Sequence, residues 1–452
     1  MEITPLESWI AGKLHLTGRP DWTRLQEHQL DRLRKTLEQV LSHSRYYRQH
    51  LRGVDPGSIR SMADVARLPF TLPEALAERP NEFLCVSPRE VSRIVTLPTS
   101  GTSGRPKRIS FTREDQELTV DFFHHGMMTL VRPFERLIIF LPGETENSVG
   151  DLLKQALARF GCEGIVFGPI SDCGQARQAL LQLRPACAVG IPSQLLAVSR
   201  HGDASSAGQI RLRSVLLCSD YVSQAVAASL ADTWGCEAYS HYGMTEMGLG
   251  GGVECHARNG YHLREADLLF EIVDPDTGER VNDGECGEVV FSTLTRRGMP
   301  LIRYRTGDRS RFLTQRCPCG SPLRRMERIS GRIGEAVRLE DGSLLSITQL
   351  DEILLGDPCV SAYAAEMTLK HNCDCLVVTL RSTHHPADAE RITARLCRSG
   401  SLGELVRQGH LKLDVREGEA GYFPSGTAKR AIADRRSQKA ADKTQMQSSR
   451  RQ

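Results

Sequence analysis

The chain lacks any long apolar run, and its first residues lack the pattern of a secretion signal. No stretch approaches the roughly 20 apolar residues of a membrane-spanning helix, and Met1–Leu16 contains no basic block followed by an apolar block. These absences predict a globular, cytoplasmic protein that is not associated with a membrane. The chain has 452 residues, which is enough for two or three domains, each with a buried core.

The chain also has little net charge, and the charge that it has is concentrated at one end. The formal charge is +3, yet residues 426–452 alone carry eight Lys or Arg and two Asp or Glu. Almost nothing apolar follows Ile432, which is typical of a solvated and partly disordered segment. We therefore assign residues 435–452 to a basic disordered tail. We expect no nucleic-acid partner, although binding of a nucleic acid by the tail is the alternative.

Fourteen cysteines without an export signal predict reduced thiols or metal ligands rather than disulfides. Cys317-Pro318-Cys319 is a tight thiolate turn, and Cys255 and His262 lie where a strand, a turn and a second strand are expected. Three thiolates and one imidazole suit tetrahedral zinc. The sequence therefore predicts one structural zinc ion bound by Cys255, His262, Cys317 and Cys319. His256 is an alternative to His262, and four reduced residues without a metal are the competing interpretation.

Hydrophobic periodicity divides the chain into regions. Residues 25–51 have the apolar spacing of one covering helix, and helical and strand-like segments alternate from 113 to 233. Such alternation predicts a largely parallel sheet with helices on its faces. Shorter strands are expected at 268–273 and 301–305, and residues 360–415 have the pattern strand, strand, helix, strand.

We therefore predict an α/β protein with a large N-terminal domain and a small C-terminal one. The N-terminal domain, residues 1–331, combines mostly parallel sheets flanked by helices with a small β subdomain. Residues 332–434 form the small α+β domain, and residues 435–452 form the tail.

A loop rich in Gly, Ser and Thr joins two predicted strands. It reads Thr99-Ser100-Gly101-Thr102-Ser103-Gly104-Arg105-Pro106-Lys107. Glycines let the backbone approach an anion, N–H groups and hydroxyls donate hydrogen bonds, and Lys107 adds positive charge. The spacing fits neither a Walker loop nor a dinucleotide fingerprint. The residues alone leave two interpretations open, a phosphate-binding loop and a hairpin without a ligand.

This loop resembles the phosphate-binding motif of the adenylate-forming superfamily, Ser/Thr-Ser-Gly-Thr-Thr-Gly-x-Pro-Lys. The segments Arg67–Thr71 and Val91–Ile94 are similar to the phenylacetate–coenzyme A ligase branch in particular. The resemblance implies that ATP phosphates are bound by the loop, and that Lys107 also takes part in catalysis. The implied phosphate-binding residues are Thr99, Ser100, Gly101, Thr102, Ser103, Gly104 and Lys107.

A second segment, residues 240–246, reads Ser-His-Tyr-Gly-Met-Thr-Glu and looks like the superfamily's Tyr-Gly-x-Thr-Glu motif. The resemblance implies that Tyr242 stacks on adenine, that Thr245 contacts the α-phosphate, and that Glu246 holds Mg²⁺. Thr245 and Glu246 would therefore be catalytic. An exposed turn would explain the segment equally well, and a structural role is the expectation for His241.

Two further segments extend the resemblance. Ser219 and Asp220 follow a predicted strand, where the family contacts adenine, although they could instead cap the next helix. Residues 303–308 read Arg-Tyr-Arg-Thr-Gly-Asp and are similar to the Arg-Tyr-x-Thr-Gly-Asp of the phenylacetate ligase branch. This likeness implies that Asp308 accepts hydrogen bonds from the ribose hydroxyls. Thr-Gly-Asp is also an ordinary turn.

The C-terminal domain resembles the family's mobile lid but departs from it at two points. Residues 329–332 are similar to the family's hinge, and Arg332 would contact the ribose or a phosphate; Gly334 replaces the acidic residue that usually follows. Residues 425–430 correspond to the family's Gly-Lys-x-x-Arg motif, whose lysine is catalytic. Thr427 occupies the position of that lysine, which leaves Lys429 as the candidate cation.

The resemblance implies an ATP-dependent carboxylic acid–coenzyme A ligase. The expected partners are ATP, Mg²⁺, a small carboxylic acid, and coenzyme A or a carrier thiol. Two alternatives stay open: an acyl-adenylating enzyme with another acceptor, and a nucleotide-binding module without catalysis. Residues 121–125 and 140–147 are plausible pocket walls. The sequence indicates neither the acid nor the oligomeric state.

Overall fold

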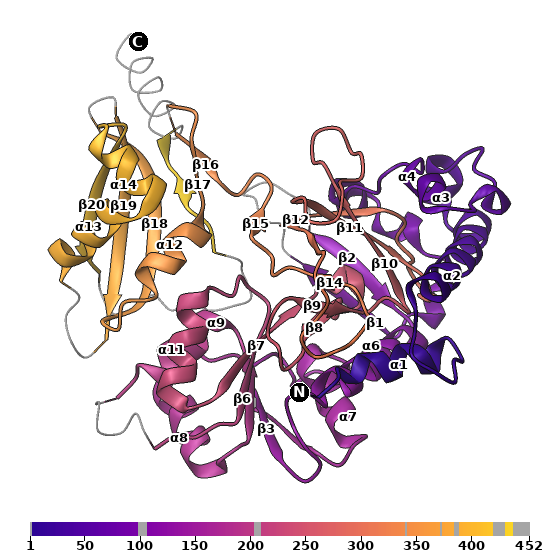
Figure 1. The fold of residues 1–452 in the computed structure, drawn as a ribbon, viewed down its shortest axis with the longest axis horizontal. Coiled ribbons are helices and arrows are strands. Elements are labelled where there is room, and N and C mark those ends of the chain that lie inside the picture. Colours follow the sequence, from indigo (N-terminus) through magenta and orange to yellow (C-terminus); the bar gives the residue numbers. More distant parts are fainter. Residues whose placement is uncertain are drawn as a thin grey trace.

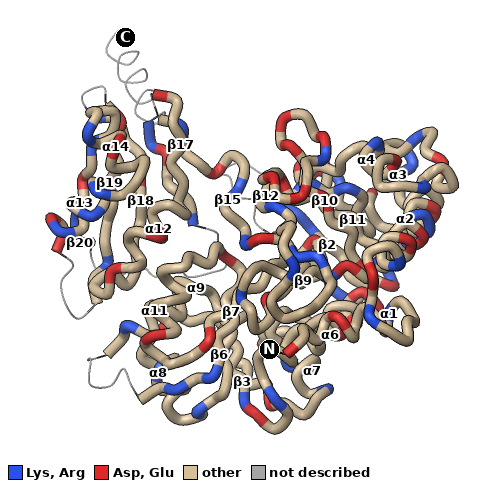
Figure 2. Tube along the Cα trace, in the orientation of Figure 1, with Lys and Arg blue, Asp and Glu red and all other residues tan. Residues whose placement is uncertain are grey.

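The computed structural model describes residues 2–97, 106–202, 209–339, 341–370, 373–383, 388–418 and 430–436. Figure 1 shows a large body built around two sheets, and a smaller unit beside it that contains the C-terminal elements. Among the described residues, no helix is both long and apolar enough to cross a bilayer. Acidic and basic residues are interspersed over the body (Figure 2).

The largest sheet has nine strands in the order β13-β14-β9-β8-β7-β6-β5-β3-β4. Five neighbouring strands run parallel: β3 (Arg136–Ile139), β4 (Glu163–Val166), β5 (Cys187–Gly190), β6 (Ser214–Leu217) and β7 (Glu237–Tyr242). The other four pair antiparallel: β8 (Gly252–Glu254), β9 (Tyr261–Leu263), β13 (Phe312–Leu313) and β14 (Arg325–Met326). The predicted parallel sheet is therefore one half of a mixed sheet, because no crossover helix separates β7, β8 and β9.

Helices cover both faces of this sheet, as the alternating pattern predicts. One face packs on α8 (Cys173–Leu183), α9 (Pro192–Ser199) and α11 (Gln224–Trp234). The opposite face packs on α1 (Pro5–Lys13), α6 (Arg113–Met127) and α7 (Val149–Ala158). Burying a separate apolar core on each face stabilises the sheet as a central layer.

A second sheet is antiparallel and has four strands in the order β10-β11-β12-β15. They are β10 (Leu268–Val273), β11 (Gly287–Thr293), β12 (Tyr304–Ser310) and β15 (Gly331–Arg332). The strand predicted at 301–305 begins later, at Tyr304, because Arg303 takes a left-handed backbone with φ 44°. The glycine-rich loop lies between β1 (Arg93–Leu97) and β2 (Lys107–Phe111), which form the expected antiparallel hairpin.

The single helix predicted over residues 25–51 is wrong, because the chain forms two helices there. They are α2 (Trp22–His43) and α3 (Arg45–His50), separated by Ser44 in an extended conformation. The Ser44 hydroxyl accepts a hydrogen bond from the backbone N–H of Tyr47 at 3.3 Å. This N-cap stabilises the start of a new helix, so the first helix ends before Ser44. Short helices α4 (Met62–Ala66) and α5 (Pro73–Glu78) follow.

The C-terminal unit is an α+β layer that packs on the large body. Its sheet has the order β20-β19-β18-β21. The strands are β18 (Val360–Lys370), β19 (Cys373–Ser382), β20 (Leu411–Glu417) and β21 (Ala433–Asp434), and the helices are α12 (Ile347–Leu354), α13 (Ala389–Arg398) and α14 (Gly400–Arg407). A hairpin, β16 (Val337–Arg338) and β17 (Leu344–Leu345), precedes them. α12 and α14 were not predicted.

The C-terminal unit and helices α9 and α11 of the body share one apolar core. Arg200, at the end of α9, donates a hydrogen bond to the carbonyl oxygen of Leu355 at 2.7 Å. The domain boundary at 331/332 stays a prediction. In the structure both boundary residues belong to β15, which pairs with β12 of the large body.

Candidate functional site

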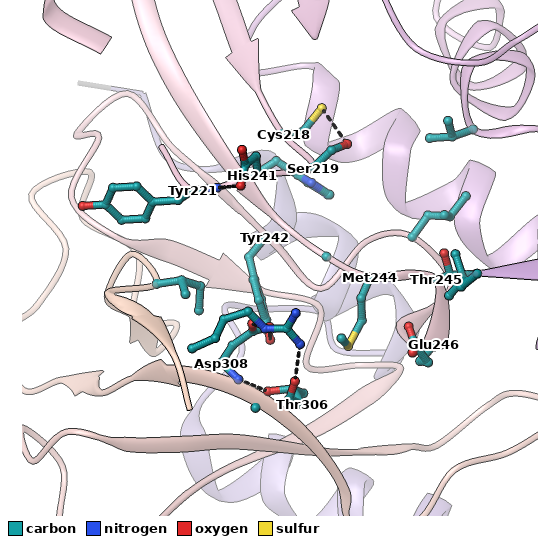
Figure 3. A pocket seen from close by; sticks show the side chains of 18 of the residues that line it. Cys218, Ser219, Tyr221, His241, Tyr242, Met244, Thr245, Glu246, Thr306 and Asp308 are labelled. Atoms are coloured by element: carbon teal, nitrogen blue, oxygen red, sulfur yellow. Dashed lines mark hydrogen bonds and ion pairs between the residues drawn. The ribbon is translucent and has the colours of Figure 1, made fainter. Parts of the chain in front are cut away.

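A cavity of about 1560 Å³ opens at the carboxyl ends of the parallel strands. Residues following β3, β6 and β7 line it, together with parts of the β1–β2 hairpin, β12 and β15. Figure 3 shows several of these side chains, from Cys218 at one end to Asp308 at the other. Open α/β sheets bind ligands at this edge, where loops from several strands converge.

Three polar side chains form a compact group at the cavity: Lys107 and Glu246 line it, and the buried Tyr304 contacts both. Lys107, at the start of β2, makes an ion pair and hydrogen bond with Glu246. Lys107 Nζ also lies 3.2 Å from the Tyr304 hydroxyl, which donates to Glu246 Oε1 at 3.2 Å. Burial alone would raise the pKa of Glu246, but the charge and hydrogen bond of Lys107 outweigh it and lower this pKa. Glu246 is therefore ionised.

A second polar group gathers around Asp308. Strand pairing places Asp308 directly opposite Arg332, and Arg332 Nε lies 2.9 Å from Asp308 Oδ1. The Tyr242 hydroxyl donates to Asp308 Oδ2 at 3.1 Å, and Thr306 Oγ1 accepts from the Asp308 N–H at 3.0 Å. Tyr242, Thr306 and Asp308 lie close together in Figure 3. Three predicted nucleotide-binding residues, Tyr242, Asp308 and Arg332, therefore meet in one place.

Ser219 and Asp220 lie at the end of β6 on the cavity wall. The alternative that they cap the next helix is wrong, because the N-cap of α11 is Ser223, whose side chain accepts from Val226 N at 3.0 Å. Ser219 has a left-handed backbone, with φ 72°. Asp220 Oδ2 instead accepts from Nε of Arg430 at 3.2 Å.

Arg430 joins the two parts of the chain at the cavity. Its two terminal nitrogens each lie 2.7 Å from an oxygen of Asp351 on α12, while its Nε reaches Asp220 on the large body. The neighbouring Glu352 accepts hydrogen bonds from the N–H groups of Gln224 and Ala225 at the start of α11. Sequence reasoning missed Arg430 as a cavity residue and Tyr304 as a partner of Lys107 and Glu246, although both belong to the motifs quoted above.

The remaining predicted residues divide into described and undescribed ones. Thr245 lies beside Glu246 on the short 3-10 turn η4 (Thr245–Met247) and lines the cavity. The loop residues Thr99–Gly104 lie outside the described residues, and so do Thr427 and Lys429.

The opposite end of the cavity is apolar. Aromatic and aliphatic side chains from α6, α7, the sheet and the loops beside it line this end: Phe122, Phe123, Met127, Leu141, Val149, Val189, Leu216, Leu249 and Val253. Of the two predicted wall segments, Phe122, Phe123, Leu141, Pro142 and Asn147 line the cavity. Asp121 does not, because it accepts from the indole N–H of Trp9 and pairs with Lys13.

The four predicted zinc ligands meet at a place apart from the cavity, beside the antiparallel strands. The ligand atoms of Cys255, His262, Cys317 and Cys319 all lie within 4.8 Å of one another, and all four residues are buried. The two sulfur atoms of Cys255 and Cys317 are 3.5 Å apart. His256 is excluded as a ligand, because its ring contacts the Tyr239 hydroxyl and Glu2. All fourteen cysteines are unpaired, as expected.

Comparison with known proteins agrees with this geometry. The sequence profile of the AMP-binding enzymes matches residues 31–295. This chain belongs to the AMP-binding enzyme family. A phenylacetate–coenzyme A ligase of Thermus thermophilus is 31% identical over 350 residues, which span 74% of this chain and 76% of that protein. The predicted resemblance to the phenylacetate ligase branch is confirmed.

Solved structures of a coenzyme A ligase share the fold. A 2-hydroxyisobutyryl-CoA ligase in its postadenylation state superposes with a TM-score of 0.78 at 20% identity, covering 95% of this chain and 93% of that one. The same enzyme in its thioesterification state gives a TM-score of 0.64 at 20% identity, covering 94% and 93%. The α/β fold predicted for this AMP-binding enzyme is confirmed.

Proposed function

We propose that this protein is an ATP-dependent carboxylic acid–coenzyme A ligase. In the first half-reaction an oxygen of the carboxylate attacks the α-phosphorus of ATP, and pyrophosphate leaves. In the second, the coenzyme A sulfur attacks the acyl carbon, AMP leaves, and the thiol proton passes to solvent. The observation that carries the proposal is one cavity with ionised Glu246 beside Lys107 at its charged end and an apolar pocket at the other. The names of the relatives support it.

In this proposal the charged groups bind the nucleotide. Asp308 and Arg332 hold the ribose, Tyr242 contacts adenine, and Lys107 and Thr245 face the phosphates. These roles follow the family motifs, and the meeting of these residues in one cavity supports them. Fixed donors placed where negative charge develops lower the barrier, because they need no reorganisation during the reaction.

Glu246 fits a magnesium ion. It is an ionised carboxylate that lines the cavity, and Mg²⁺ prefers one or two carboxylates together with substrate phosphates. The ion would neutralise the charge of the leaving pyrophosphate. Because Lys107 pairs with Glu246 in this structure, the protein also supplies a cation at the same point.

We further propose that residues 332–434 act as a lid over residues 1–331. The higher TM-score to the postadenylation state supports an arrangement suited to the first half-reaction. So does Arg430, which bridges Asp220 and Asp351 at the cavity. Lys429 remains the proposed cation of this lid.

Lys429 can be tested directly. Lys429→Ala should lower the rate of pyrophosphate release about a hundredfold, because loss of a charge-stabilising donor costs about 2.7–4 kcal/mol. Thr427→Lys should raise the rate if the family position is the better one. Unchanged rates in both variants would show that the lid supplies no cation for adenylation.

The Cys/His cluster fits a structural zinc ion. Tetrahedral zinc with sulfur ligands at about 2.3 Å places the sulfur atoms about 3.8 Å apart, close to the 3.5 Å between Cys255 and Cys317. Metal analysis should find one zinc per chain, and replacing both Cys317 and Cys319 by Ser should remove it and lower stability. The exposed Cys286 provides a control, since Cys286→Ser should keep the metal. Zinc-free protein, or zinc that survives the double replacement, would contradict the site.

The function is tested by measuring pyrophosphate release with a panel of carboxylic acids, with and without coenzyme A. A ligase releases pyrophosphate and forms the acyl-coenzyme A thioester. An acyl-adenylate that forms but does not react with coenzyme A would indicate another acceptor. No pyrophosphate release with any acid would indicate a nucleotide-binding module. The cytoplasmic location and the absence of a nucleic-acid partner stay predictions.

A further inference from the structure

The apolar end of the cavity contains one polar ring, that of His241. His241 lies near the end of β7, opposite Val253 of the neighbouring strand β8. Residue Leu217 of β6 pairs with Ser240, so the Cys218–Ser219 turn lies next to His241 (Figure 3). The ring makes an edge contact with Phe123 of α6, with centroids 6.3 Å apart. His241 therefore lies among the side chains of the apolar pocket.

No described residue forms a hydrogen bond with this ring. His241 Nε2 is buried without a partner, while part of the side chain is open to the cavity. Burial lowers the pKa of His241 to about 4, so the imidazole is neutral near pH 7. A neutral imidazole has one donor and one acceptor nitrogen. Leaving such groups unpaired in an apolar setting is costly.

Two other partly buried histidines in this chain have carbonyl partners. His28 Nε2 lies 3.1 Å from the carbonyl oxygen of Ala266, and His50 Nε2 lies 3.0 Å from that of Phe70. These are satisfied structural histidines, the role that we had expected for His241. His241 differs because its surroundings offer no such acceptor and because it borders the cavity.

The backbone next to His241 makes room for the ring. A Cβ atom on Gly243 would lie 2.8 Å from His241 Cε1 and 2.1 Å from the carbonyl oxygen of Leu249. Only glycine therefore allows this turn to pass behind the ring. The arrangement keeps the imidazole at the cavity wall, four residues before Thr245 at the charged end.

The direction of the substrate follows from the proposed function, on which this inference rests. The carboxylate must reach the phosphates near Lys107 and Glu246, so the body of the acid extends into the apolar end. Two rings, Phe122 and Phe123, line that end and suit an aromatic body.

We propose that His241 hydrogen-bonds a neutral polar substituent, such as a hydroxyl, on an aryl carboxylic acid and thereby selects this substrate class. A second carboxylate is disfavoured, because a neutral ring cannot compensate a buried charge.

The experiment compares ring-hydroxylated phenylacetic acids with their methyl isosteres. Pyrophosphate release by the full-length protein gives kcat/KM for the ortho, meta and para acids of both series. At one ring position the hydroxyl acid should exceed the methyl acid by about tenfold to a hundredfold, since a buried polar group left unpaired costs that much. His241→Leu should bring this ratio to one or below, mainly by lowering kcat/KM of the hydroxyl acid.

Two further variants separate recognition from packing. His241→Gln has a donor and an acceptor and should keep part of the preference, and it carries the test if His241→Leu fails to fold. Phe123→Leu alters the same wall without changing hydrogen bonding, so it should leave the ratio unchanged. The inference is overturned if methyl acids equal or surpass hydroxyl acids at every position, or if the preference survives in both His241 variants. No pyrophosphate with any acid would overturn the proposed function and this inference together.

Discussion

The two ends of the cavity differ in whether their buried polar groups have partners within the protein. At the charged end, Glu246 is paired with Lys107, and Asp308 is paired with Arg332. At the apolar end, the His241 ring has no hydrogen-bond partner among the described residues. The charged end is thus held in place before any ligand arrives, whereas the apolar end keeps one unsatisfied group.

This difference indicates that the two ends have different roles in binding. A buried charge without a partner costs several kcal/mol, so the carboxylates of the charged end need partners even when ATP is absent. Leaving a neutral ring unpaired costs less free energy than leaving a charge unpaired. A substrate that hydrogen-bonds to the ring removes this cost, so it is favoured over a substrate that cannot. Changes at the charged end should therefore affect all acids alike, and changes at the apolar end should affect some acids more than others.

The largest effect is expected from Glu246→Gln. The substitution removes the negative charge that pairs with Lys107 and would hold magnesium, so pyrophosphate release should fall about a hundredfold to a thousandfold. The fall should be the same for hydroxyl and methyl acids. Tyr304→Phe is the matched control, because it removes only a hydroxyl 3.2 Å from Glu246 and should cost less than tenfold. A rate for Glu246→Gln within threefold of the wild type would contradict the role of Glu246.

A smaller effect is expected from Asp308→Ala. Removing this carboxylate takes away the proposed acceptor of the ribose hydroxyls. It also removes the ion pair between Asp308 and Arg332. The dissociation constant of ATP, measured by calorimetry, should rise about tenfold to a hundredfold. Tyr242→Phe, which removes only the 3.1 Å hydrogen bond to Asp308, should change it less. Unchanged ATP affinity in Asp308→Ala would contradict the assignment.

The smallest effect concerns His241 and pH. Its pKa in the folded protein is about 4, below the value of about 6.5 for an exposed histidine. Between these values the unfolded chain binds a proton that the folded chain does not, so the folded state loses stability as the pH falls through this window. His241→Leu lacks this contribution. Between pH 7 and pH 5 its free energy of unfolding should fall less than that of the wild type, by on the order of 1–2 kcal/mol.

Chemical unfolding at the two pH values measures this difference. His43→Leu is a suitable control, because His43 is exposed and lies away from the cavity. Equal losses in wild type and His241→Leu would show that His241 is not held neutral, and the contrast between the two ends would then disappear.

Much of the fold could be predicted because its signals are local. The strand expected at 268–273 matches the observed β10, since a continuous apolar run bounded by turn residues identifies a buried strand. The helix break at Ser44 was missed, because a serine within an apolar helical pattern can either continue the helix or cap a new one. The late start of β12 was missed because nothing in the residue type of Arg303 indicates a left-handed backbone.

By itself, the sequence determined the kinds of chemistry available. The glycine-rich loop, the Thr245-Glu246 pair, the Thr-Gly-Asp turn at Asp308 and the Cys/His ligand set are all readable as residue patterns, because each depends on residue type and spacing. These patterns also indicated the family.

Tertiary structure alone decided which of these groups meet. Lys107 and Glu246 are 139 positions apart, and only the approach of the β1–β2 hairpin to the end of β7 makes them an ion pair. Strand register places Asp308 opposite Arg332. His241 looked like a structural histidine, because a sequence shows that a ring is present but not whether the neighbours that fold around it offer a hydrogen bond. Contacts between distant segments depend on strand pairing and packing, and these arise only when the whole chain has folded.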